Sequence, residues 1–202
     1  MMLAITGGRP ARLVVLAYDI TSPRRARCVR RILDSRHHAK QYSVFEVMLG
    51  DGELRGVLAE ISTCCDFESD LLAAWWPADG LRLGWRQGRL TVTARNGEPC
   101  QTRASLRPNI GNFVVCYDVS DADALVAVAK EVAREGAMIQ RSVYWLRIPT
   151  TRLTTLLQRC TGYLADGDRL WAYPLAGSRD LWHVGTPSTS IIPISTHRWR
   201  SS

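Results

Sequence analysis

Two aspartates occupy positions where a carboxylate could bind a metal ion. Asp19 ends the apolar run of residues 12–18, and Asp118 ends a similar run 99 positions later. Magnesium takes about six oxygen ligands, so one carboxylate is too few, whereas two facing carboxylates predict a weak shared site that activates water. The alternative is that each aspartate caps the helix that follows it. His37 and His38 have no counterpart at the same offset, so no catalytic residue is assigned.

The segment after the first aspartate is rich in arginine. At about 100° per residue, three arginines fall on one side of a helix with a fourth at its edge: Arg24, Arg27, Arg31 and Arg30. An arginine grips phosphate with a planar fork, and no acidic residue interrupts residues 23–32. Because a merely solvated face usually mixes both charges, we predict that these arginines bind a nucleic-acid backbone. Arg141 and Arg82 are further candidates for this surface.

The corresponding segment of the second half has a different charge. It carries four acidic residues against two basic ones: Asp121, Asp123, Glu131 and Glu135 against Lys130 and Arg134. We therefore expect a nucleic-acid surface that is stronger on the first half than on the second.

The composition is that of a folded, basic protein. The 202 residues carry a net charge of +7, and 24 of the 26 basic residues are arginine. This balance favours a nucleic-acid partner, although a GC-rich genome also raises the arginine content. No stretch approaches the ~20 apolar residues of a membrane span, and the N-terminus is too short for a signal peptide. We therefore expect a cytoplasmic protein without a membrane partner.

Six cysteines are spaced without a Cys-x-x-Cys pair: Cys28, Cys64, Cys65, Cys100, Cys116 and Cys160. This spacing argues against a zinc ribbon and against a disulfide framework. We expect these residues to be free structural thiols in a reducing cytosol. Glycine-rich phosphate loops are also missing from the sequence, so nucleotide hydrolysis has no support.

The chain contains an internal repeat. Three matches occur in the same order, two at an offset of 99 positions and one at 98: 14–20 with 113–119, 41–46 with 140–145, and 70–77 with 168–174. Ordered matches at nearly one offset indicate a duplicated domain, with a first domain at 1–95, a linker at 96–110 and a second domain at 111–202.

Each copy predicts the same order of elements. Ser22 and Pro23 are expected to start the first helix, and Ser120 to cap its counterpart. The remaining elements of the first copy are a buried strand before this helix, a strand pair or bent strand at 41–49, a helix at 52–64 and a strand at 71–76. The order βαββαβ predicts an α+β protein of two tandem ferredoxin-like domains. The tryptophans of the apolar runs are expected to pack in the core: Trp75, Trp76, Trp145 and Trp171.

Two motifs of the first copy carry a resemblance to a known family. They are Tyr18-Asp19-Ile20 and Gln41-Tyr42-Ser43-Val44-Phe45-Glu46, followed by an acidic residue before an apolar strand. At this spacing the first copy, and more loosely the second, resembles the CRISPR-associated Cas2 family. That family is usually one ferredoxin-like domain that forms a homodimer and sends its last strand to the partner. The resemblance implies an intramolecular pseudo-dimer here, with crossing strands at Leu90–Ala94 and Thr189–Ile192.

The same resemblance implies a function in CRISPR adaptation. It implies a subunit that binds prespacer duplex DNA and scaffolds the Cas1 integrase during spacer acquisition. The alternative is a metal-dependent endonuclease acting on RNA or DNA, or a related toxin-type ribonuclease, with Asp19 and Asp118 as ligands of Mg²⁺. A small-molecule sensor is a third class, against which the arginines argue. We predict the scaffold, because a nuclease needs more polar groups than these two aspartates supply.

Overall fold

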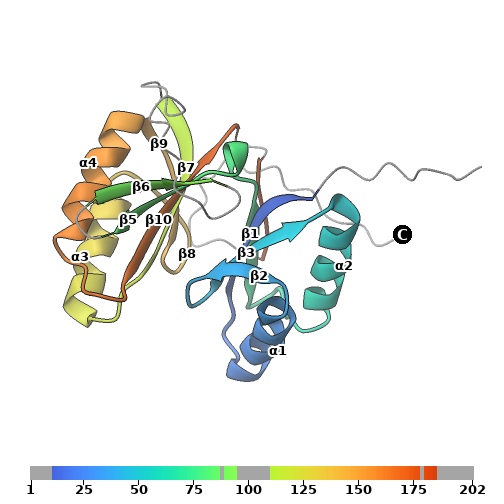
Figure 1. The fold of residues 1–202 in the computed structure, drawn as a ribbon. Coiled ribbons are helices and arrows are strands. Elements are labelled where there is room, and N and C mark those ends of the chain that lie inside the picture. The colour runs from blue at the N-terminus through green and yellow to red at the C-terminus, as the bar shows by residue number, and fades with distance from the viewer. Residues whose placement is uncertain (1–10, 87–88, 95–109, 178–179, 186–202) are drawn as a thin grey trace, which may run out of the picture.

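The computed structural model describes residues 11–86, 89–94, 110–177 and 180–185, which contain two copies of one unit (Figure 1). The first copy consists of β1 (Arg12–Asp19), α1 (Pro23–Asp34), β2 (His37–Lys40), β3 (Val44–Leu49), α2 (Asp51–Ser62) and β4 (Leu71–Trp75). The second consists of β7 (Ile110–Asp118), α3 (Ala122–Ala133), β8 (Gly136–Gln140), β9 (Val143–Pro149), α4 (Thr150–Thr161) and β10 (Arg169–Leu175). The predicted order βαββαβ is confirmed in both copies.

The first helix of each copy starts at a side-chain cap. Ser22 caps α1 and Pro23 is its first residue, as the sequence predicts. The prediction that Ser120 caps α3 is wrong, because the carboxylate of Asp121 accepts the N–H bond of the first turn. The hydroxyl and backbone N–H of Ser120 instead donate to Asp168, which leaves the cap to the next residue.

Each sheet is completed by a strand that follows the other copy. One sheet has the order β11-β4-β1-β3-β2, and the other has the order β6-β5-β10-β7-β9-β8. Strand β5 (Arg82–Arg86) follows the first copy in sequence but pairs with β10. Strand β11 (Leu181–Val184) follows the second copy but pairs with β4. The halves therefore exchange their terminal strands within one chain.

The first crossing strand lies earlier in the chain than predicted. Residues 90–94 fall mostly in β6 (Arg89–Thr93), which pairs with β5 at the outer edge of the sheet. The chain crosses sooner because η1 (Ala78–Gly80) turns it directly after β4. Within this turn, Asp79 and Gly80 have φ angles of 54° and 64°. The second predicted crossing strand, at 189–192, and residues 96–109 of the predicted linker lie outside the described residues.

The two sheets face each other, and the helices cover their outer faces (Figure 1). Alternate residues of β1 separate the two packing layers: Val14 and Leu16 contact the layer under α1 and α2, whereas Val15 and Ala17 contact the other sheet. A strand buried on both faces reads as a continuous apolar run, which explains its sequence. The four tryptophans pack as predicted: Trp75, Trp145 and Trp171 between the sheets, and Trp76 on the helix side.

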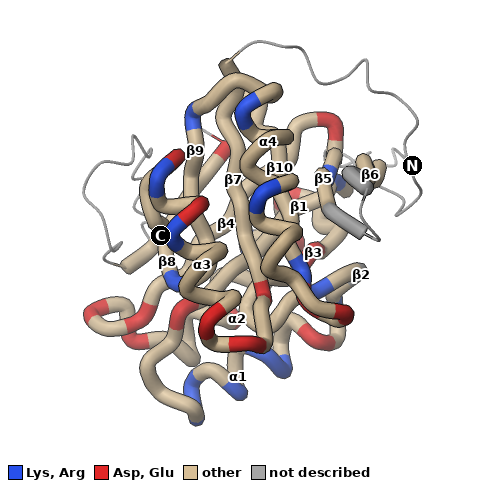
Figure 2. Tube along the Cα trace, turned by 90° about the vertical axis from the view of Figure 1, so that its left-hand side faces the viewer, with Lys and Arg blue, Asp and Glu red and all other residues tan. Residues whose placement is uncertain are grey.

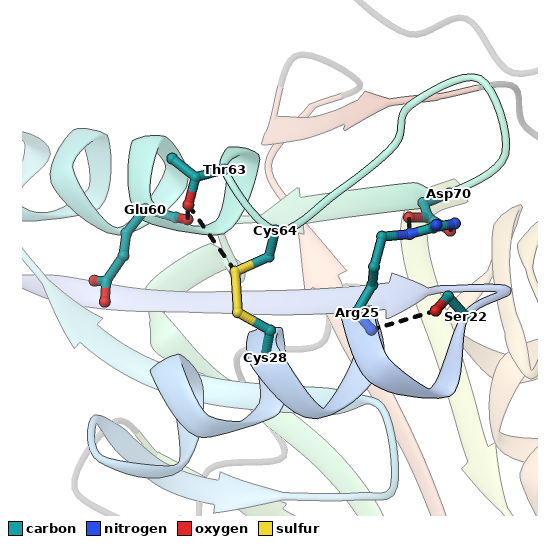
Figure 3. Close-up of a disulfide and its surroundings, with 7 residues drawn as sticks. All are labelled: Ser22, Arg25, Cys28, Glu60, Thr63, Cys64 and Asp70. Atoms are coloured by element: carbon teal, nitrogen blue, oxygen red, sulfur yellow. Dashed lines mark hydrogen bonds and ion pairs between the residues drawn. A yellow bond between two sulfur atoms is a disulfide. The ribbon is translucent and has the colours of Figure 1, made fainter.

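A disulfide joins the two helices of the first copy. Cys28 of α1 is bonded to Cys64, which follows α2, at a Cα–Cα distance of 6.2 Å (Figure 3). The expectation that all cysteines are free thiols is therefore wrong, because two cysteines far apart in sequence meet where the helices lie side by side. Three cysteines of the described residues are free: Cys65, Cys116 and Cys160. Among the described residues, no helix is long and apolar enough to cross a membrane.

Candidate nucleic-acid interface

One side of α1 presents three arginines, Arg24, Arg27 and Arg31, which we call the arginine stripe. All three are exposed, and none of their side chains has an ion pair or hydrogen bond to another described residue. The opposite side of the helix is buried and apolar: Val29, Ile32 and Leu33. Figure 2 shows basic positions along this helix. Three guanidinium groups without an ion pair to a described residue can each grip a phosphate, so the predicted cationic surface is present.

The two further predicted residues, Arg30 and Arg141, differ in their surroundings. Arg30 is half-buried, with Nε 3.9 Å from the carboxylate of Asp34 and its guanidinium 5.3 Å from the ring centroid of Tyr42. Arg141 is exposed in the turn between β8 and β9, next to the end of β1. Its side chain has no partner among the described residues, so it remains available to a ligand.

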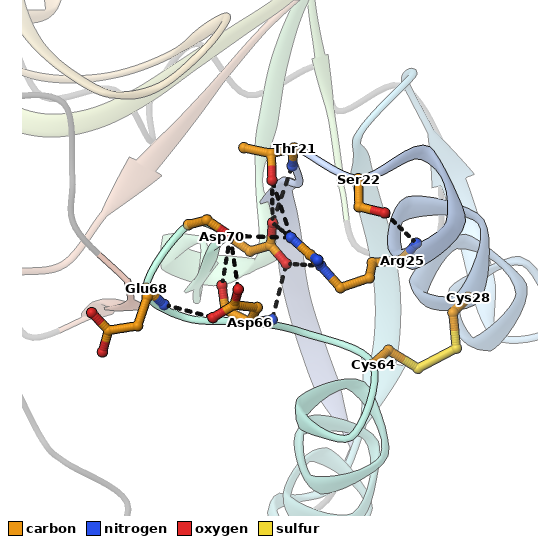
Figure 4. A network of polar contacts seen from close by, with 9 residues as sticks. Thr21, Ser22, Arg25, Cys28, Cys64, Asp66, Glu68 and Asp70 are labelled. Atoms are coloured by element: carbon orange, nitrogen blue, oxygen red, sulfur yellow. Dashed lines mark hydrogen bonds and ion pairs between the residues drawn. A yellow bond between two sulfur atoms is a disulfide. The ribbon is translucent and has the colours of Figure 1, made fainter.

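A buried carboxylate holds α1 in place. Asp70 is 2% exposed and accepts hydrogen bonds from the side chain of Arg25, at 2.7 and 3.0 Å, and from the N–H and hydroxyl of Thr21 (Figure 4). Burial alone would raise the pKa of Asp70. The bonds from Arg25, from the N–H of Asp66 and from Thr21 outweigh burial and lower this pKa to about 2. The acidic residue of the motif is therefore a structural clamp on the β1–α1 turn.

The second copy repeats this clamp without the arginine. Asp168 accepts the N–H and hydroxyl of Ser120, both at 2.9 Å, and the N–H of Ala165 at 2.9 Å. Burial opposes ionisation here too, but the hydrogen bonds prevail and the pKa of Asp168 is lowered. The internal repeat places Asp70 and Asp168 at equivalent positions, but the sequence does not indicate which groups these carboxylates bind.

In the second copy, arginines of α4 and at the end of α3 form ion pairs with two glutamates. Arg134 and Arg159 lie 2.6 and 2.7 Å from Glu131, and Arg152 and Arg159 lie 2.6 and 3.5 Å from Glu135. Surface ion pairs add little stability, but they occupy the guanidinium groups that would otherwise meet a phosphate. Among the described residues, α3 and α4 therefore offer fewer arginines free of ion pairs than α1 does.

The two strand-end aspartates lie at the seam between the copies. The backbone N–H of Arg141 donates to Oδ2 of Asp19 at 3.4 Å, and the N–H of Tyr42 donates to Oδ2 of Asp118 at 3.1 Å. Each aspartate thus binds the other copy, in two equivalent contacts. Neither aspartate caps a helix, because Ser22 and Asp121 do so, and the capping alternative is wrong.

The donor set at the seam does not fit a resident magnesium ion. Asp19 and Asp118 each already accept a backbone hydrogen bond, and the described residues contain no group of three His, Cys, Asp or Glu that could hold a metal. Magnesium in proteins keeps an octahedron of oxygens, which two hydrogen-bonded carboxylates leave mostly to water. These two carboxylates alone therefore do not make a complete magnesium site at the seam.

Two glutamines precede these contacts at matching positions in the two copies. Gln41 and Gln140 are 3% and 1% exposed, and their side-chain amides have no hydrogen-bond partner among the described residues. A buried amide without a protein partner usually bonds internal water, so we expect ordered water at the seam.

A buried polar cluster, unforeseen from the sequence, lies between the sheets. Oε1 of Glu46 accepts the hydroxyl of Tyr173 at 2.9 Å and the guanidinium of Arg82 at 2.8 Å. Arg82 also stacks on Trp171, 4.4 Å from the ring centroid, so the expectation that it adds to a nucleic-acid surface is not supported. The position equivalent to Glu46 in the second copy is Trp145, so this cluster occurs on one side only.

The repeated region matches a known family. Residues 12–76 and 112–180 match the family described as CRISPR associated protein Cas2. Among solved structures, the chain is similar to a hypothetical protein, TT1823, from Thermus thermophilus. The identity is 30% over 34% of this chain and 85% of that chain, with a TM-score of 0.33. No curated protein matches the chain.

Proposed function

Because this chain belongs to the Cas2 family of CRISPR-associated proteins, we propose that it holds a prespacer DNA duplex during spacer acquisition and scaffolds the Cas1 integrase. Membership itself implies a function in a CRISPR system. The finer role is our proposal, and the arginine stripe is the observation that carries it. Exposed arginines without ion pairs suit the sequence-independent grip on phosphates that a holder of many different spacers requires.

A metal-dependent endonuclease is the second candidate. Metal-dependent activity is known for the Cas2 family in general, and the position of Asp19 and Asp118 at the seam, where each accepts a bond from the other copy, favours this alternative. The two aspartates at the seam support a nuclease less well than the arginine stripe supports binding of a nucleic-acid backbone. A holder needs positive charge, which α1 supplies.

The salt dependence of DNA binding tests the proposal. Each phosphate contact contributes about 0.9 to the slope of log K against log salt. Replacing Arg24, Arg27 and Arg31 with alanine is therefore expected to flatten the slope by about two to three, equally for duplexes of unrelated sequence.

A matched control removes the same number of positive charges elsewhere. Arg55, Lys130 and Arg134 are exposed on α2, on α3 and at the end of α3. Their triple alanine variant is expected to keep nearly the parent slope. Equal slopes for the parent and the arginine-stripe variant would show that α1 does not hold the duplex.

A further inference from the structure

Tyr42 is presented to solvent on a firmly held turn. The side chain is 69% exposed, the highest value among the large apolar side chains of the described residues. The turn between β2 and β3 is fixed on both sides, because the N–H of Tyr18 donates to the carbonyl of Ser43 at 3.1 Å and the N–H of Tyr42 donates to Asp118. An exposed aromatic ring on a rigid turn loses little conformational freedom when a ligand binds.

The ring of Tyr42 lies against one cationic side chain. The guanidinium of Arg30 lies over it, and Arg30 belongs to the helix that carries the arginine stripe. The equivalent turn of the second copy presents Arg141 in place of Tyr42, also exposed and held through its N–H by Asp19. The exposed ring of Tyr42 thus lies against the helix that carries the arginine stripe.

We propose that Tyr42, backed by Arg30, stacks on an unpaired nucleobase of the nucleic acid whose phosphates the arginine stripe holds. Every base has a flat π face, so such stacking tolerates any sequence, and a guanidinium on the ring strengthens it. The bases inside a duplex are already stacked on each other. The ligand is therefore nucleic acid with unpaired bases next to a duplex. The inference rests on the proposed function and extends it from duplex to overhang.

Three DNA probes separate base stacking from phosphate contacts. They are a blunt duplex, the same duplex with a single-stranded thymidine overhang, and the same duplex with an abasic overhang of equal length. The parent protein is expected to bind the thymidine overhang about fivefold to a hundredfold more tightly than the abasic one. Tyr42→Ala is expected to abolish this ratio without changing binding to the blunt duplex, whereas Tyr42→Phe keeps it.

A matched control and a direct readout complete the test. Tyr163 is another exposed tyrosine, 44% exposed and located after α4, and Tyr163→Ala is expected to leave the ratio unchanged. Photocrosslinking of an iodouridine overhang is expected to label the peptide that contains Tyr42.

Two outcomes would overturn the inference. One is a ratio that survives Tyr42→Ala; the other is an equal loss of affinity for all three probes. If Tyr42→Ala instead weakens only binding of the integrase, the ring is a protein-docking group and not a base platform. Failure of the parent to bind the blunt duplex would refute the proposed function itself, whereas blunt-duplex binding without an overhang preference refutes only this inference.

Discussion

Neighbouring groups decide what each carboxylate of this protein does. Asp70 and Glu46 are buried and bind an arginine each, so one clamps a turn and the other joins two sheets. Asp19 and Asp118 lie at strand ends and bind backbone N–H groups across the seam. The same side chain thus serves as a structural clamp or a seam contact according to the donors around it.

Asp70→Asn is expected to destabilise the protein by about 2 kcal/mol at neutral pH, because a pKa lowered from 3.8 to about 2 means that folding favours the charged form. This stabilisation is complete above the unfolded-state pKa of about 4 and disappears as the pH falls towards 2. Denaturant unfolding of both proteins between pH 2 and pH 7 measures it. Asp168→Asn should have a smaller effect because no arginine binds Asp168, and the exposed Asp166→Asn is the control. A pH-independent difference would contradict the clamp.

The double variant Asp19→Asn, Asp118→Asn is expected to leave spacer integration by the whole complex largely intact. Asparagine keeps the side chain's size and can still accept the N–H bonds of Arg141 and Tyr42, but it loses the charge that binds Mg²⁺. An enzyme built on these carboxylates should lose a hundredfold or more in rate. Integration assays with purified integrase, beside nuclease assays on RNA and DNA, separate the two roles. A collapse of integration with folding and duplex binding unchanged would favour the nuclease.

Among the elements, α1 is tied to the rest of its copy more firmly than α3. Asp70 holds its first turn, and the Cys28–Cys64 disulfide joins its middle to the end of α2. The equivalents of these cysteines in the second copy are Ala127 and Tyr163, so α3 has no such bond. Burial raises the pKa of the neighbouring Cys65 thiol to about 11, which keeps it protonated and unreactive towards the disulfide.

Reduction of the disulfide is expected to lower the free energy of unfolding by about 2–4 kcal/mol, because the bond closes a loop across 36 positions in the unfolded chain. Unfolding with and without reductant measures the loss, and Cys28→Ser should reproduce it. Thiol titration in denaturant should find two more thiols after reduction than before. Equal thiol counts would show that the bond does not form.

The elements were more predictable from sequence than their contacts. The apolar runs and helix starts follow from local patterns, so Ser22, Pro23 and the order βαββαβ could be predicted. Contacts between distant positions leave no local pattern: Glu46 and Tyr173 are 127 positions apart, and the two bonded cysteines are separated by 36 positions, one in α1 and one after α2. The crossing strand is predicted at residues 90–94 from the repeat offset, whereas β5 is the strand that crosses, and the pairing of its Arg82 with Glu46 of the first copy leaves no local pattern. Of the candidate site, the arginine stripe could be predicted from sequence, whereas the contact between Arg30 and the exposed ring of Tyr42 could not.

At the scale of the whole molecule, the two copies are related by an imperfect symmetry. The Glu46–Arg82–Tyr173 cluster has an apolar counterpart, in which Trp145, Leu181 and Trp75 stand at the equivalent positions. A pair made of two first copies would place Glu46 and Arg82 beside Trp75 and would lack the tyrosine hydroxyl. A pair made of two second copies would contain the tyrosine but would lack the ion pair. The packing between the sheets therefore favours the union of unlike copies.

Arg82→Met is expected to cost about 3–5 kcal/mol of stability, because it leaves the carboxylate of Glu46 buried without its cation. Adding Glu46→Leu should restore part of the loss, since a buried ion pair can often be replaced by apolar groups, whereas the buried hydroxyl of Tyr173 then lacks its acceptor. Chemical unfolding of the parent, the single variant and the double variant completes the comparison. A double variant as unstable as the single one would place the effect in packing and not in charge.

The imperfect symmetry also gives the molecule a direction. A scaffold with true two-fold symmetry makes the same contacts with both ends of a bound duplex, so it cannot distinguish one end from the other. Here one helix offers free arginines while its counterpart region has ion-paired ones, and one turn offers Tyr42 where the other offers Arg141. A duplex bound to such a surface has two unequal ends, and a partner arriving at either end meets a different neighbour. Joining the two copies in one chain makes this polarity a fixed property of every molecule, with no need for two separate subunits to find each other.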